Sequence, residues 1–225
     1  MKLIAPNLWT LEYHLPLLGT EQGRVVTIIR IESGELIIHS TGPFSPEDVE
    51  AISSVGRPAW LIDAMLYHDT FAQQGRAAFP GIPYLAPEGF ASVAKVDSQP
   101  ILPVPSQWNG EVEVVRLEGA PKIDEHVFFH VPSRTLVVAD LVFNFNGQGT
   151  AWERFFRRYA IGLKHQPGMS RIFRAFVADR AAFERSIAQM MRWNFDRVIV
   201  AHKEMIASGA KEKLRQALHE AGFNA

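Results

Sequence analysis

The 225-residue chain contains no cysteine, which excludes disulfides, thiolate metal ligands and a cysteine nucleophile. No stretch approaches the roughly 18 apolar residues of a membrane-spanning helix, and residues 1–15 lack the apolar core of a signal peptide. The 23 Lys and Arg nearly balance 24 Asp and Glu, so there is no general attraction to nucleic acid or anionic membranes. We therefore expect a cytoplasmic protein that binds a small-molecule substrate or ligand and has neither a nucleic-acid nor a membrane partner. The composition favours no particular oligomeric state.

The pattern of apolar and turn-forming residues predicts a mixed α/β protein. Two β-branched runs, 25–30 and 36–39, flank a Ser-Gly turn, which predicts a hairpin. Ser45 and Pro46 then have the chemistry of a helix start, as N-cap and first helical residue. Further strands are expected at 58–63, 82–85, 111–117, 126–131, 135–139 and 197–201. Further helices are expected at 70–79, 87–95, 151–163, 179–192 and 207–221.

This order of elements fits one domain over residues 1–225. Helices have to cover the apolar outer faces of mixed sheets that are followed by α/β crossovers. Two mixed sheets packed face to face, with helices outside both, satisfy that requirement. A three-layer sandwich with one sheet is the alternative that the pattern leaves open.

Two apolar stretches that end in polar residues suggest a family. Residues 136–143 (LVVADLVF) are similar to a strand that ends in G-D-x-x-F, and residues 196–202 (DRVIVAH) look like a last strand that ends in histidine. Residues 7–9 resemble an opening strand, and residues 35–41 an early strand with a polar end. In this order and spacing, nearly the whole chain resembles the metallo-β-lactamase superfamily. The resemblance implies a four-layer αββα sandwich, with two mixed sheets and helices outside.

The chain departs from that superfamily at the signature H-x-H-x-D-H, so it resembles a divergent branch. The resemblance places Ala64 and Leu66 where the family has its first two His ligands, and Ala120 where it has its middle His. One of the two metal sites of the family would therefore have no ligands left in this chain.

The resemblance implies that the second metal site keeps its donors. They would be His68, Asp69, Asp140 and His202, with the family's Asp-His pair reversed. Two imidazoles and two carboxylates suit one Zn²⁺, Fe²⁺ or Mn²⁺ ion, and an open position on such a metal can activate a water molecule. Asp140 would be the catalytic residue, because it would ligate or orient that water.

Each of these residues also has a structural interpretation. Asp69 is a good helix N-cap, and Asp140 can accept N–H bonds in the loop that follows it. Ligands of open α/β sheets bind at the carboxyl ends of strands, which favours function for Asp140 and His202. Lys203 stands where the family usually has Gly; a cation beside a metal ligand is unfavourable unless it points away or binds an anionic substrate.

Two more residues are candidates for the pocket. His39 ends an early strand, and Glu118 ends another strand beside the lost middle His. We expect both to be structural rather than ligands.

Two functions remain open at this point. The chain is either a mononuclear metal-dependent hydrolase of an ester, amide or phosphoester, or a ligand-binding module that has lost the metal and is not catalytic. A redox role, as in some members of the superfamily, needs a fuller dinuclear ligand set than this chain offers.

Overall fold

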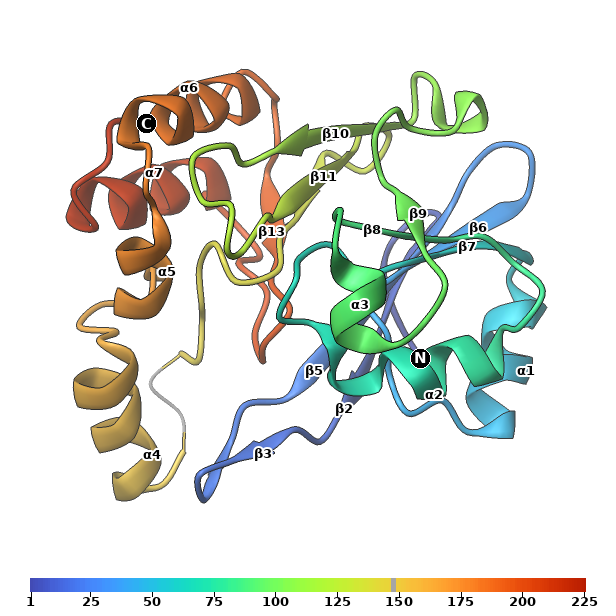
Figure 1. Cartoon of the computed structure of the whole chain (residues 1–225), viewed down its shortest axis with the longest axis horizontal. Helices are drawn as coiled ribbons and strands as arrows, with labels where there is room; N and C mark the ends of the chain where they lie inside the picture. The colour runs from blue at the N-terminus through green and yellow to red at the C-terminus, as the bar shows by residue number, and fades with distance from the viewer. Residues whose placement is uncertain (147–148) are drawn as a thin grey trace.

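The computed structural model describes residues 1–146 and 149–225, and it contains two β-sheets packed face to face (Figure 1). The larger sheet has, in spatial order, β1 (Lys2–Ala5), β2 (Leu8–Tyr13), β5 (Arg24–Arg30), β6 (Glu35–His39), β7 (Arg57–Ile62), β8 (Tyr84–Ala86) and β9 (Gln99–Pro100). The smaller sheet has β10 (Val112–Arg116), β11 (His126–His130), β12 (Thr135–Val137) and β13 (Arg197–Ile199). A separate hairpin is formed by β3 (Pro16–Leu17) and β4 (Thr20–Glu21).

Helices cover the outer face of each sheet (Figure 1). The larger sheet is covered by α1 (Pro46–Ser54), η1 (Asp69–Phe71), α2 (Ala72–Ala78) and α3 (Phe90–Ala94). The smaller sheet is covered by α5 (Arg171–Phe176), α6 (Arg180–Met190) and α7 (Ala210–Glu220). In the sequence, α4 (Ala151–Phe156) follows β12 and continues as the π-helical turn η3 (Arg157–Ile161), which precedes α5. A short turn, η2 (Ser106–Trp108), precedes β10.

Alternation along the strands divides the interior into three apolar layers. On β5, Val25 and Ile29 pack between the sheets, whereas Val26 and Ile28 pack under the helices of the larger sheet. Phe128 on β11 likewise points inward, and its strand neighbours pack against α6 and α7. Strands that are apolar on both faces require covering layers on both sides. The expected four-layer αββα sandwich is therefore confirmed, and the one-sheet alternative is wrong.

Parallel pairing brings the ends of several strands to one edge. In the smaller sheet β12 runs parallel to β13, with Val137 opposite Ile199, so the loops that follow both strands lie together. In the larger sheet β6 runs parallel to β7. The N–H of Val25, at the start of β5, donates to the carbonyl of Ala201 over 2.8 Å and so joins the two sheets at this edge. Within the described residues, no helix is long and apolar enough to cross a membrane.

Gly119 allows the loop after β10 to pack against the start of α6. Its φ is +80°, and a Cβ atom built there would lie 2.1 Å from the carbonyl oxygen of Asp179. Gly89 has a similar φ of +89°, but a Cβ there would meet nothing within 4 Å. A side chain at Gly89 would therefore cause backbone strain alone, whereas a side chain at Gly119 would cause backbone strain and steric overlap.

We predict that Gly119→Ala lowers the free energy of unfolding by about 2 to 4 kcal/mol, from left-handed strain plus overpacking. Gly89→Ala should cost only the strain, about 1 to 2 kcal/mol. Urea denaturation of both variants measures the difference. Equal losses would show that the contact between Gly119 and Asp179 is not as close as described.

Candidate metal centre

Three side chains meet at the edge where the strand ends come together. His68 lies in the loop between β7 and η1, Asp140 follows β12, and His202 follows β13. One donor atom from each lies within 4.8 Å of the others. Oδ1 of Asp140 is 3.3 Å from Nε2 of His68 and 3.1 Å from Nε2 of His202. His68 and His202 are buried and Asp140 is half-buried, so the group is largely shielded from solvent.

A backbone carbonyl decides which nitrogen of His202 carries hydrogen. Nδ1 of His202 lies 2.7 Å from the carbonyl oxygen of Gly23, which can only accept, so Nδ1–H is the donor. In the neutral ring Nε2 then carries a lone pair, and this lone pair faces the carboxylate of Asp140. Two acceptors at 3.1 Å need a proton or a cation between them. A His that donates its other N–H to a carbonyl is the usual support of a metal ligand.

The rings are fixed by aromatic contacts as well. The ring of His202 stacks on Phe143 with centroids 5.4 Å apart, and it meets the ring of His68 edge-on at 5.7 Å. Burial first, and then the charge of Arg24, lower the pKa of His68 to about 4. His68 is therefore neutral at pH 7, which is the form of imidazole that binds metals.

The carboxylate of Asp140 is held ionised. Its burial acts to raise the pKa, but the interactions with the facing imidazoles of His68 and His202 outweigh this and hold the pKa below its ordinary value. An ionised carboxylate between two imidazoles is a strong partner for a cation.

Glu125 holds the backbone that carries Asp140. Its buried carboxylate accepts the N–H of Ala139 over 2.8 Å and the N–H of Asp140 over 3.0 Å. Burial and the nearby charge of Asp140 raise the pKa of Glu125 to about 8. The sequence analysis missed this residue; its signal was an acid directly before the apolar strand β11.

The donor set fits a divalent metal. Two imidazoles and one carboxylate match the three protein ligands of catalytic zinc sites and the two-His, one-carboxylate set of non-haem iron. With metal–ligand bonds of about 2.0 Å in tetrahedral geometry, neighbouring donors are about 3.3 Å apart. The two nitrogen–oxygen distances, 3.3 Å and 3.1 Å, are close to that value.

Solved structures of similar shape cover nearly the whole chain. One is a metallo-β-lactamase from Pontibacter korlensis, at 14% identity and a TM-score of 0.62, covering 98% of this chain and 97% of that one. The DIM-1 metallo-β-lactamase (16%, TM-score 0.63, 98% and 95%) and FIM-1 from Pseudomonas aeruginosa in its mono-zinc form (13%, TM-score 0.63, 98% and 94%) are others. The chain has the metallo-β-lactamase fold. No protein-family model and no curated protein matches the sequence.

Asp69 is the one predicted ligand that stays outside the group of His68, Asp140 and His202. It begins the turn η1 and is half-buried. The alternative that Asp69 caps a helix is wrong, because the N-cap position of η1 is His68 and no side-chain cap bond is formed there.

The other pocket candidates are not members of the group of His68, Asp140 and His202. His39 is buried between the sheets, where its ring meets Phe128 edge-on at 4.7 Å; burial and the neighbouring His68 lower its pKa to about 3. Glu118 is exposed beside α6, and its N–H donates to Ser186. The ammonium of Lys203 lies 3.8 Å from Glu21 and lines a neighbouring groove, so it is not a cation crowded against the metal ligands.

Hydrocarbon side chains occupy the three positions at which the sequence resemblance places the other His ligands of the family. Ala64 packs between the sheets, and Ala120 packs with Met65 against α6. Leu66 is half-buried under the helices of the larger sheet. Because none of the three lost positions carries a side-chain donor, they form no second metal site.

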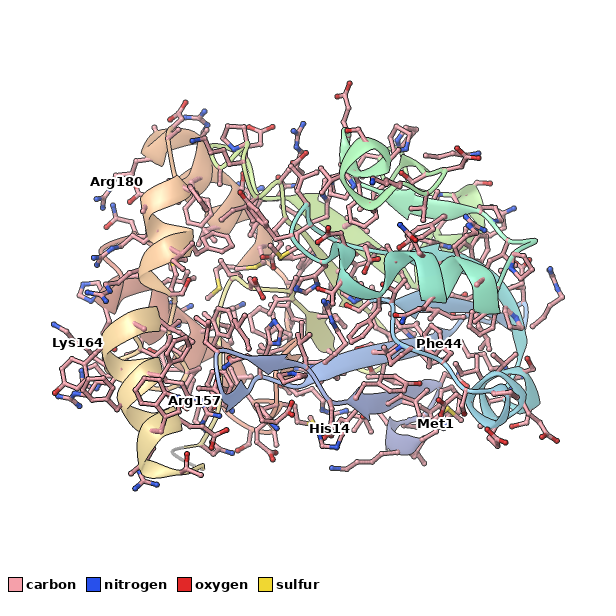
Figure 2. All side chains as sticks on the ribbon, turned by 60° about the horizontal axis from the view of Figure 1, so that its bottom comes forward. Met1, His14, Phe44, Arg157, Lys164 and Arg180 are labelled. Atoms are coloured by element: carbon pink, nitrogen blue, oxygen red, sulfur yellow. The ribbon has the colours of Figure 1, made fainter. Side chains whose placement is uncertain are left out.

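A cavity of about 500 Å³ opens onto the group of His68, Asp140 and His202. Its walls include apolar side chains from the β3–β4 hairpin, from the loop after β12, and from α4 and α5. They include Leu15, Leu17, Leu18, Phe143, Phe156 and Ile172. Arg157, at the junction of α4 and η3, donates to the carbonyl of Glu21 and so ties α4 to this hairpin (Figure 2). The site is thus at the base of a mostly apolar cavity.

We predict that Asp140→Ala and His202→Ala each abolish binding of one equivalent of Zn²⁺, because each removes a ligand from a three-ligand set. Lys203→Ala is the control: it is adjacent in sequence but paired with Glu21, and it should keep full stoichiometry. Elemental analysis measures metal content, and circular dichroism verifies folding. Full zinc content in both ligand variants would refute the centre.

Glu125→Gln should weaken metal binding by about 10- to 100-fold. The amide NH2 group cannot accept a hydrogen bond, so one of the two bonds from the N–H groups of Ala139 and Asp140 is lost and the backbone at Asp140 is held less firmly. The matched control, Glu118→Gln, changes an exposed carboxylate and should leave affinity unchanged. Competition with a chromogenic chelator gives both affinities. If the two variants behave alike, Glu125 does not position Asp140.

Proposed function

We propose that the chain is a mononuclear metal-dependent hydrolase, a divergent member of the metallo-β-lactamase superfamily with its metal held by His68, Asp140 and His202. The observation that carries the proposal is the placement of His202, whose Nδ1 meets the carbonyl of Gly23 while its Nε2 lies 3.1 Å from the carboxylate of Asp140. FIM-1, a protein of the same fold, binds zinc, as its mono-zinc form shows. Fold likeness alone does not assign a function, so the site has to carry the proposal.

A divalent metal in such a site, Zn²⁺, Fe²⁺ or Mn²⁺, supplies Lewis-acid chemistry and lowers the pKa of a coordinated water. Asp140 accepts a hydrogen bond from the attacking water and orients it, because its carboxylate stays ionised. His68 and His202 provide the nitrogen donors, and the carbonyl of Gly23 accepts from Nδ1 of His202 and so leaves Nε2 for the metal.

The cavity walls have their own part in the proposed reaction. Apolar side chains from the β3–β4 hairpin and α4 exclude water from the bound substrate. In such surroundings electrostatic interactions are stronger than in water. The substrate is a small molecule with an ester, amide or phosphoester bond, and the protein acts away from membranes and nucleic acids, in the cytoplasm.

We predict that the metal-loaded protein hydrolyses at least one substrate from a panel of nitrophenyl esters, anilides and nitrophenyl phosphates. Asp140→Ala should lower kcat/KM by at least about 10³-fold, because ligand and orienting group are lost together. Lys203→Ala should retain the activity. Release of nitrophenol or nitroaniline is followed by absorbance, with and without a chelator.

The result that overturns the proposal is a protein that binds no metal from excess Zn²⁺, Fe²⁺ or Mn²⁺ at neutral pH. The non-catalytic ligand-binding module then takes its place. The buried hydrocarbon at Ala64 and Ala120 is the observation that favours that module, since the resemblance places His ligands of the family at these positions and neither alanine can bind a metal.

A further inference from the structure

Arg24, the first residue of β5, is a buried cation with unused donors. Its side chain lines the same cavity as His68, Asp140 and His202, yet the residue is only 1% exposed. Neither Nε nor Nη1 has a hydrogen-bond partner in the described part of the chain. The guanidinium carbon lies 5.9 Å from the centroid of the Phe71 ring, which supplies no acceptor atom. Unpaired buried donors are costly, so a chain that keeps them needs a reason.

Two of the three carboxylates that act on Arg24, those of Asp63 and Asp140, face other donors, and neither Nε nor Nη1 of Arg24 bonds to the third, Asp69. Asp63, at the end of β7, accepts the N–H and the hydroxyl of Thr41 over 3.1 and 2.8 Å, and it also accepts the hydroxyl of Tyr84. Asp140 faces the two imidazoles. Asp63 and Asp140 stabilise the charge of Arg24 through space, although burial lowers its pKa. A guanidinium remains protonated at any pH at which a protein is folded. Its donors are therefore charged and free for an oxyanion.

Arg24 is also rigidly connected to the metal centre. Its neighbour Gly23 holds His202 through the 2.7 Å bond to Nδ1, and its other neighbour, Val25, donates to Ala201. A ligand group bound by Arg24 is therefore fixed relative to His202 and Asp140. This placement is what a substrate anchor needs, because it sets which bond reaches the centre.

We propose that Arg24 binds the anionic group of the substrate, a carboxylate or a phosphate carried on an apolar body. The apolar body fits the walls formed by Leu15, Leu17, Phe156 and Ile172. The planar fork of Arg24 can bind two oxygens of either group at once. Insofar as it names a substrate class, the inference rests on the proposed hydrolase function, but the binding of the anion can be measured by itself.

The test is calorimetric titration of the zinc-loaded protein with octanoate, octyl phosphate, octanol and inorganic phosphate. Octanoate or octyl phosphate should bind better than octanol, and the tighter of the two identifies the anionic group. Arg24→Met should weaken that ligand by about 10- to 100-fold, as expected for loss of a charge-assisted pair. Arg158→Met, which removes an exposed cation from η3, is the control and should change nothing.

Arg24→Lys is a second variant, which keeps the test decisive if Arg24→Met fails to fold. It keeps the charge but loses the fork, and it should weaken the anion by a smaller factor than Arg24→Met does. Zinc content of each variant is measured in parallel. Equal binding by wild type, Arg24→Met and Arg24→Lys, or no preference for the anions over octanol, overturns the inference. A wild type without zinc overturns the proposed hydrolase instead, and Arg24-dependent binding of octanoate would survive that result.

Discussion

The contact between Asp140 and two imidazoles is the interaction on which the site depends. It is made across the two sheets, because Asp140 and His202 follow strands of the smaller sheet while Gly23, which fixes His202, precedes β5 of the larger one. With Nδ1–H of His202 committed to Gly23, the opposite nitrogen can face a carboxylate favourably only through a proton or a cation. Glu125 holds the Asp140 backbone in place from below. Each of the two ligands from the smaller sheet is thus held by a hydrogen bond to another residue: His202 by Gly23, and the backbone of Asp140 by Glu125.

Around this contact the chain buries more charge than an apolar interior tolerates without compensation. Asp63 is satisfied by Thr41 and Tyr84, and Glu125 by backbone N–H groups, whereas Nε and Nη1 of Arg24, a residue that lines the cavity, have no partner in the described part of the chain. Ala64, Leu66 and Ala120, where the sequence resemblance places the other three His ligands of the family, carry only hydrocarbon side chains.

Much of the fold could be predicted from the sequence, because strand alternation and turn residues are local signals. The hairpin of β5 and β6 and the capping box of α1 follow directly from such signals. Other features depend on tertiary packing: the expected helix 70–79 divides into η1 and α2, and the expected helix 151–163 ends in a π-helical turn. In the site, His68, Asp140 and His202 could be placed by resemblance. Arg24 and Glu125 could not, because only burial distinguishes them from ordinary charged residues next to strands. Asp69 was included because the resemblance makes it the Asp of a reversed Asp-His pair, and it lies outside the group.

The most direct measurement is an anomalous difference map at the zinc edge from crystals grown with Zn²⁺. The geometry predicts one strong peak, within about 2.0 to 2.2 Å of Nε2 of His68, Nε2 of His202 and an oxygen of Asp140. A well-ordered site with no peak there, and with His202 still facing Asp140, would mean that a proton makes the contact. A peak on His39 or Asp69 instead would contradict the assigned ligand set.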